Sequence, residues 1–129
     1  MRKLLLDSHA LFWFIDGDAR LSNAARGAIE AADCTVYVSA VTAWEIASKF
    51  RLGKWPKALA LANDLASIMS ALGFEPLPIS LEHARHAGIL QKSHRDPFDR
   101  MLAAQAEIEG IPLVTADPAF RYFKVRTFW

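Results

Sequence analysis

Short apolar segments that alternate with helical patterns are the feature that most constrains how this chain can fold. Residues 2–6 (RKLLL) predict a buried strand, and 35–39, which are β-branched and aromatic, predict another. A further strand is expected over 111–117 (IPLVTAD), with extended pieces over 74–79 and 123–128, the last of them an edge strand. Helices are expected at about 9–15, 22–32, 41–51, 56–72, 80–91 and 97–109. Strands that alternate with helices indicate an α/β fold whose mostly parallel sheet is covered on both faces.

The size and composition of the chain fit a single domain. Hydrophobic residues make up 53% of the 129 residues, enough for a proper core. The net charge of +1 creates no whole-molecule field for a nucleic acid or a membrane, although a local acidic site and a basic rim would cancel in that sum. Cys34, expected to be buried beside a strand, has no other cysteine in the chain with which to form a disulfide. Asp7 and His9 interrupt the apolar run at the N-terminus, which argues against a signal peptide. No apolar stretch reaches the length of a membrane span, so we expect a cytoplasmic protein.

Acidic residues lie at the edge where a parallel sheet places its sites. One acid closes the first strand, another lies two residues past the apolar part of 111–117, and a third lies in the first turns of the helix after the second strand. Two more stand at the start of the helix 97–109. Ligands of open α/β sheets bind off the carboxyl ends of the strands, so acids from four separate segments could converge there. These acids are Asp7, Glu45, Asp96, Asp99 and Asp117.

Carboxylates gathered in one place repel each other and would normally force protonation. A divalent cation lets them stay ionised at neutral pH, and an all-oxygen set without cysteine suits Mg²⁺ or Mn²⁺. Such an ion polarises a phosphoryl oxygen and activates water for attack. The pattern therefore predicts metal-assisted phosphodiester hydrolysis.

Each acid also has an ordinary structural explanation. Asp96 precedes a proline, which is typical of a helix N-cap, and Asp99 would then favour the helix dipole. Asp7 could be a turn residue, Asp117 could cap a short helix, and Glu45 could be a solvated helix position. Spacing alone therefore leaves a metal site and these structural roles as open alternatives.

Four short motifs follow one another along nearly the full length of the chain. The first is LLLDSHALFWF, which contains Asp7, and the second is VSAVTAWEIASKFRLGK, which contains Glu45. The third, HRDPFDRMLAAQA, fits the pattern D-x-x-[LI]-A-x-x-A from Asp99, and the fourth, LVTADPAF, has Thr115 two residues before Asp117. In this order and spacing, the motifs resemble those of the PIN-domain ribonucleases, in particular the VapC toxins of bacterial toxin–antitoxin pairs.

The resemblance implies a single PIN domain over 1–129, with a three-layer α/β fold and a mostly parallel central sheet of four or five strands flanked by helices. It also implies an endoribonuclease that uses Mg²⁺ or Mn²⁺. Its catalytic, metal-binding acids would be Asp7, Glu45, Asp99 and Asp117. The residues that would support these ligands are Asp96, Thr115 and Ser8, and a direct metal contact from Asp96 stays open.

The implied partners are an RNA substrate, a second copy of the chain and a VapB-like antitoxin that blocks the site. DNA would be met only through the antitoxin, and no membrane partner is expected. Basic residues near the second and third motifs could follow the RNA backbone, although each could instead be a solvated surface charge and Arg100 could pair with an acid. They are Lys49, Arg51, Lys54, Lys57, Lys92, Arg95 and Arg100, with His94 as a phosphate contact or helix cap.

Three other functions stay open at the level of sequence. The chain could be a PIN nuclease of RNA processing, or a non-catalytic binding module whose acids are caps and turn residues. It could also be a phosphatase with an aspartyl nucleophile at Asp7, but that chemistry favours a second acid two residues on, where this chain has His9.

Overall fold

Five parallel strands form one sheet in the residues that this computed structural model describes, 2–90 and 95–129. The sheet order is β3-β2-β1-β4-β5, and each of the four pairings is parallel. The central strand β1 therefore lies between β2 and β4, where the order of the strands reverses. The strands are β1 (Arg2–Leu6), β2 (Cys34–Ser39), β3 (Glu75–Leu77), β4 (Leu113–Val114) and β5 (Thr127–Phe128).

Helices connect these strands. Within the described ranges, none is long and apolar enough to cross a membrane. The α-helices are α1 (Ser8–Asp16), α2 (Asn23–Glu30), α3 (Ala40–Arg51), α4 (Leu59–Leu72), α5 (Leu81–Ile89) and α6 (Pro97–Glu109). Two short 3₁₀ helices, η1 and η2, span Pro56–Ala58 and Pro118–Tyr122.

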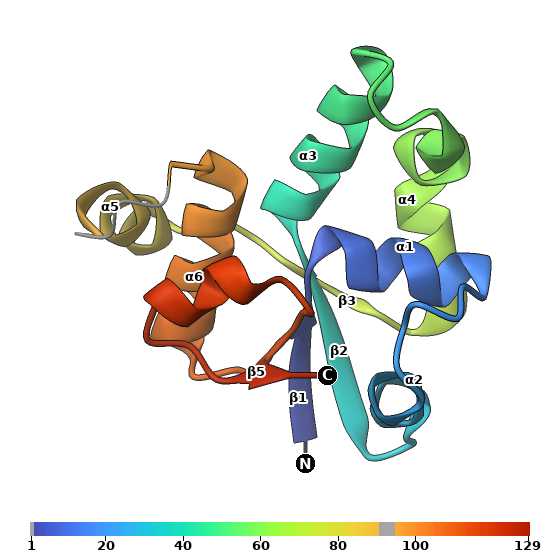
Figure 1. The fold of residues 1–129 in the computed structure, drawn as a ribbon, viewed down its shortest axis with the longest axis horizontal. Helices are drawn as coiled ribbons and strands as arrows, with labels where there is room; N and C mark the ends of the chain where they lie inside the picture. Colours follow the sequence, from blue (N-terminus) through green and yellow to red (C-terminus); the bar gives the residue numbers. More distant parts are fainter. Residues whose placement is uncertain (1, 91–94) are drawn as a thin grey trace.

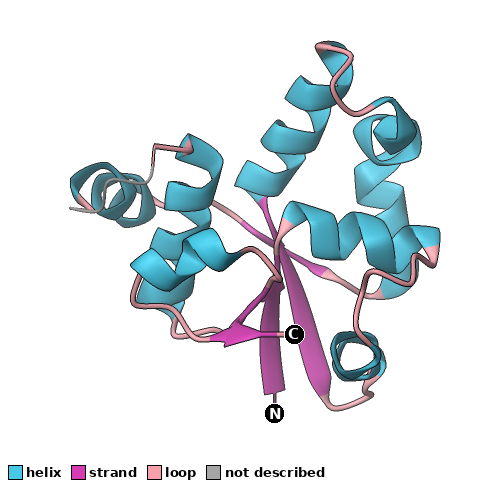
Figure 2. Ribbon diagram, viewed as in Figure 1, coloured by secondary structure: helices cyan, strands magenta, loops and turns pink. Residues whose placement is uncertain are grey.

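The side chains of β1 alternate between two hydrophobic clusters, one on each face of the sheet. Leu4 and Leu6 are fully buried in a cluster with residues of α1, α2 and α4. Leu5 is buried in the other cluster, with residues of α6 and η2. Figure 1 shows α5 and α6 on one side of the strands and α1, α2 and α4 on the other, and Figure 2 shows the strands between the two sets of helices. The expected three-layer architecture is therefore confirmed.

The predicted elements are all present, but several are shorter than expected, and the edge strand expected over 123–128 is confined to Thr127–Phe128. The helix predicted from 56 to 72 begins with the 3₁₀ turn η1, and α4 has a non-helical φ of −130° at Asp64. The strand predicted over 111–117 contracts to β4, because Pro112 has no N–H to donate and Asp117 already begins η2. Cys34 is half-buried, not buried as expected, since it lies at the first position of β2.

Candidate active site

A small cavity at the carboxyl ends of β1 and β4 collects the predicted acids, and we call it the acidic cavity. Its volume is about 80 Å³. The starts of α1, α6 and η2 contribute to its wall, so several helix N-termini meet there. The lining residues are Asp7, Ser8, His9, Glu45, Lys49, Asp96, Asp99, Leu102, Asp117 and Phe120.

Asp7 is the most buried acid of the cavity, with a relative exposure of 7%. It ends β1 and caps α1, where its Oδ1 accepts a hydrogen bond of 2.7 Å from the Ala10 N–H. The pKa of Asp7 is raised from 3.8 to about 6, mainly by burial and in smaller part by the charges of Glu45 and Asp117. Hydrogen bonds from the Thr115 side chain and the Ala10 backbone act in the opposite direction and lower the pKa. A cation beside this carboxylate would relieve both the desolvation and the repulsion.

Glu45 enters the cavity from α3 and is also buried. Its Oε2 lies 2.5 Å from Nζ of Lys49, one turn further along the same helix. An ion pair at this spacing is available to any regular helix. Lys49 therefore partly neutralises the acidic cavity in the present structure.

Asp96 and Asp99 belong to the start of α6 and have different local roles. Asp96 is the N-cap: its Oδ1 accepts hydrogen bonds from the N–H groups of Phe98, at 2.9 Å, and Asp99, at 3.2 Å. Pro97 occupies the first helical turn, so the sequence-based assignment of the cap is confirmed. Both acids line the cavity, and capping therefore does not remove Asp96 from the site.

Asp117 reaches the cavity from the segment after β4, where it caps the start of η2. Its Oδ1 accepts a hydrogen bond of 2.9 Å from the Ala119 N–H, and its own N–H donates to the Thr115 hydroxyl at 3.0 Å. The Thr115 side chain is buried and also hydrogen-bonds Asp7. Thr115 thus connects the acids at the ends of β1 and β4.

The donor set fits a hard divalent cation, because five carboxylates from four segments surround one cavity with no thiolate among them. The side chains do not yet form a closed ligand shell. Across 2–90 and 95–129, no group of three His, Cys, Asp or Glu side chains stands close enough to hold a metal ion. Caps at Asp7, Asp96 and Asp117 and the ion pair at Glu45 hold these carboxylates apart.

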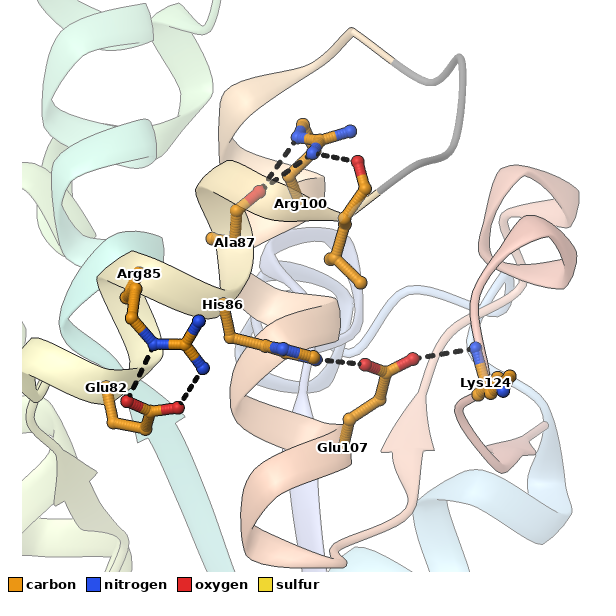
Figure 3. A network of polar contacts seen from close by, with 8 residues as sticks. Glu82, Arg85, His86, Ala87, Arg100, Glu107 and Lys124 are labelled. Carbon is orange, nitrogen blue, oxygen red and sulfur yellow. Dashed lines mark hydrogen bonds and ion pairs between the residues drawn. The ribbon is translucent and has the colours of Figure 1, made fainter.

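Of the basic residues predicted to contact RNA, Lys49 lines the acidic cavity, whereas Arg51, Arg95 and Arg100 do not. The Arg100 guanidinium donates to backbone carbonyls at the end of α5: Nη2 lies 2.8 Å from the Ala87 oxygen and 2.5 Å from that of Leu90 (Figure 3). Its contacts therefore indicate a role in joining α5 to α6. Two of the predicted RNA contacts, Lys92 and His94, lie outside the described residues.

Two further residues lie near the site: His9, which the sequence left open between an approach to the site and a surface or packing role, and Gln105, which was not singled out from the sequence. His9 lines the cavity next to Asp7, and its partial burial lowers its pKa. Gln105 is fully buried; its Oε1 accepts from the Ser39 hydroxyl and its Nε2 donates to the Pro78 carbonyl at 3.2 Å, which fixes α6 against the end of β2. A glutamine within the apolar face of a helix is the signal that could have revealed it.

Comparisons with known proteins agree with this architecture. The model of the PIN domain family matches residues 4–125. The chain is 34% identical over 125 residues to Ribonuclease VapC22 of Mycobacterium tuberculosis, covering 94% of this chain and 92% of that protein. The chain therefore belongs to the PIN domain family, among its VapC-type members.

Solved structures share the fold at low sequence identity. A crystal structure of VapBC2 from Rickettsia felis, bound to a DNA fragment from its promoter, has a TM-score of 0.73 at 17% identity and covers 98% of both chains. A toxin–antitoxin complex from Klebsiella pneumoniae has a TM-score of 0.61 at 19% identity and covers 94% of this chain and 90% of that chain.

Proposed function

We propose that this protein is a divalent-metal-dependent endoribonuclease that acts as the toxin of a VapBC-type toxin–antitoxin pair. The observation that carries the proposal is the meeting of five acids, from four segments far apart in sequence, around one cavity at the ends of the central strands. Membership of the VapC-type PIN proteins supports it, since the named relative is a ribonuclease.

Asp7, Glu45 and Asp99 would hold the principal ion, Mg²⁺ or Mn²⁺, with Asp117 as a direct or water-mediated ligand. When bound, the ion supplies Lewis-acid activation of the scissile phosphate and of the attacking water. Thr115 orients Asp7 through its hydroxyl, and Asp96 keeps the start of α6 in place. The products would carry a 5′-phosphate and a 3′-hydroxyl, so the RNA 2′-hydroxyl takes no part as a nucleophile.

Lys49 has a second task in this proposal. Its ammonium group neutralises Glu45 while the cavity holds no cation. Binding of a cation by Glu45 would release Lys49 toward the phosphodiester, where a positive charge stabilises the charge that develops during attack.

The proposed biological setting is a cytoplasmic homodimer that is inhibited by a VapB-like antitoxin and meets DNA only through it. The structures that share the fold support this setting, because they include VapBC2 on promoter DNA and another toxin–antitoxin complex. Both the homodimer and the antitoxin would be tested by co-expression with the product of the neighbouring gene, followed by measurement of the mass of the complex.

The central experiment is cleavage of a panel of RNAs by the purified full chain with EDTA, Mg²⁺ or Mn²⁺. We expect cleavage with either metal and none with EDTA. Asp99→Asn should lower the rate at least about 100-fold, because the loss of a ligand exceeds the 10- to 100-fold loss typical of a group that only supports a ligand. Asp33→Asn is the matched control, since Asp33 is an exposed acid away from the acidic cavity.

Metal-independent cleavage, or equal rates for the two variants, would contradict the proposal. A protein that binds RNA with no cleavage in any metal would instead be a binding module. A protein that becomes covalently phosphorylated on Asp7 would be a phosphotransferase.

A further inference from the structure

A second cavity, of about 270 Å³, adjoins the acidic cavity, and we call it the basic cavity. His9, Lys49, Lys54 and Trp55 line it. His9 and Lys49 also line the acidic cavity, so the two share a wall. Its volume is slightly below the range of about 300–1,000 Å³ typical of small-ligand pockets. A chain-like ligand bound at the acids could therefore continue directly into this space.

The aromatic part of the basic cavity is held in place by the core. The Trp55 ring packs edge-on against Phe12, with ring centroids 5.2 Å apart, and is half-buried. The ring of His9 stacks on Trp55 at 5.0 Å with an angle of 26° between the planes. These residues come from α1 and from the connection after α3, which the ring contacts bring together.

The connection that carries Lys54 and Trp55 is itself fixed. The N–H groups of both residues donate to the Lys49 carbonyl, at 2.9 Å and 3.2 Å. Gly53 precedes them with a φ of +74°, a left-handed conformation that favours glycine and turns the chain back at the end of α3. The indole and both ammonium groups are therefore presented from one short, hydrogen-bonded segment.

The charge of the basic cavity is opposite to that of its neighbour. Lys54 is exposed, and no acid within the described part of the chain lies within ion-pair distance of its ammonium group. Lys49 is paired with Glu45, on the side of the acids. A phosphodiester chain leaving the carboxylates thus meets two lysines beside an aromatic surface.

From this arrangement we propose that the basic cavity is a nucleotide subsite of the enzyme. It would receive the nucleotide next to the scissile phosphate, with the base stacked on Trp55 and His9 and its phosphate near Lys54. Stacking on aromatic rings tolerates any base and suits single-stranded RNA, which exposes its base faces. The proposal rests on the nuclease function above, and it assigns Trp55, His9 and Lys54 as residues that position RNA in the cavity beside the acids.

The test measures RNA binding separately from cleavage. The variants are Trp55→Leu, which keeps apolar bulk but removes the aromatic face, Trp55→Phe, which restores it, and Lys54→Gln. Lys124→Gln is the matched control, because Lys124 is exposed and lines neither cavity. Binding is followed by fluorescence anisotropy of a labelled single-stranded RNA in EDTA, and cleavage by kcat and KM with Mn²⁺.

We expect Trp55→Leu to raise Kd and KM about tenfold with a smaller change in kcat, as the loss of one stacked base predicts. Trp55→Phe should recover most of the binding, Lys54→Gln should weaken it severalfold, and Lys124→Gln should leave it unchanged. A series of RNAs with one abasic nucleotide adds a coupling test. An abasic nucleotide at one position next to the cleavage point should weaken RNA binding by the wild type but not by Trp55→Leu.

Equal binding by Trp55→Leu, Lys54→Gln and Lys124→Gln would overturn the subsite, as would an abasic penalty that Trp55→Leu leaves intact. If Trp55→Leu fails to fold, Lys54→Gln decides the question together with the abasic series on the wild type, where no abasic penalty next to the cleavage point would overturn the subsite. A wild type that binds RNA but cleaves none would refute the nuclease function alone, and the binding measurements would still decide the subsite.

Discussion

The acidic cavity and the interface between α5 and α6 both concentrate charged side chains, but they balance that charge differently. In the interface Glu107 contacts His86 with one oxygen and the Lys124 N–H with the other, and on the exposed surface of α5 Glu82 pairs with Arg85 (Figure 3). In the cavity five acids lie around one small space, and Lys49 forms an ion pair with one of them, Glu45.

This difference separates charge that stabilises the fold from charge that opposes it. A charged group with a partner of opposite charge beside it gains little from a further cation. Replacing such a group by a neutral one at an exposed site changes the free energy of unfolding little. Clustered carboxylates destabilise the metal-free fold and gain from any cation that binds the folded state. The comparison therefore marks the cavity, and not the interface, as the place where a cation would act.

The largest effect should appear in the pH dependence of the metal-free protein. The pKa of Asp7 is raised from 3.8 to about 6 in the fold, so the folded state keeps a proton that the unfolded chain loses first. The contribution of Asp7 to stability is therefore fully present below about pH 4, is lost as the pH rises toward 6, and amounts to at most about 3 kcal/mol. Denaturant unfolding in EDTA at a series of pH values measures this loss.

Asp7→Asn should remove most of that pH dependence and make the metal-free protein more stable at pH 7, while it abolishes cleavage. Asp33→Asn, an exposed acid, should keep the wild-type profile. If stability depended on pH in the same way for Asp7→Asn and the wild type, the carboxylates of the cavity would not destabilise the metal-free fold, and the contrast with the interface would be wrong.

The second effect concerns Arg100, whose guanidinium joins α6 to the end of α5. Arg100→Ala leaves the Ala87 and Leu90 carbonyls at the end of α5 without their guanidinium donor, which should lower the free energy of unfolding by about 2 kcal/mol. Arg121→Ala is the control, because Arg121 makes one long contact of 3.4 Å to the Pro118 carbonyl. Unfolding free energies that match within error would refute a structural role for Arg100.

The acidic cavity and the interface also show which features of the fold and the site can be predicted from the sequence. The bounds of the helix 97–109 were correct because Pro97 and Gly110 are local signals that need no tertiary information. The carboxyl ends of parallel strands explain why the acids could be expected near one another. Local rules also make the pair of Glu45 and Lys49 readable from the sequence, since these residues lie four apart on a helix.

What could not be predicted depends on contacts between distant elements. Arg100 lies beside Asp99 in the sequence and suggested an RNA contact, yet its guanidinium turns to carbonyls ten or more residues upstream. The basic cavity likewise needs α1 and the connection after α3 to meet. Neither juxtaposition has a periodic or local signature in the chain.

The smallest effect should come from Glu107, and it sharpens the contrast with the cavity. The Glu107 and His86 side chains are only 14% and 27% exposed, and Glu107 Oε2 lies 2.5 Å from His86 Nε2. Glu107→Gln keeps an oxygen for the Lys124 N–H and an amide for His86, so we expect a loss of about 1 kcal/mol in the free energy of unfolding. Glu82→Gln, at an exposed pair, should leave the unfolding midpoint unchanged. Because both neutralised acids are locally paired, neither variant should become more stable at neutral pH, whereas Asp7→Asn should. A gain in stability for Glu107→Gln would mean that the interface also stores repulsion, and the distinction between the two regions would fail.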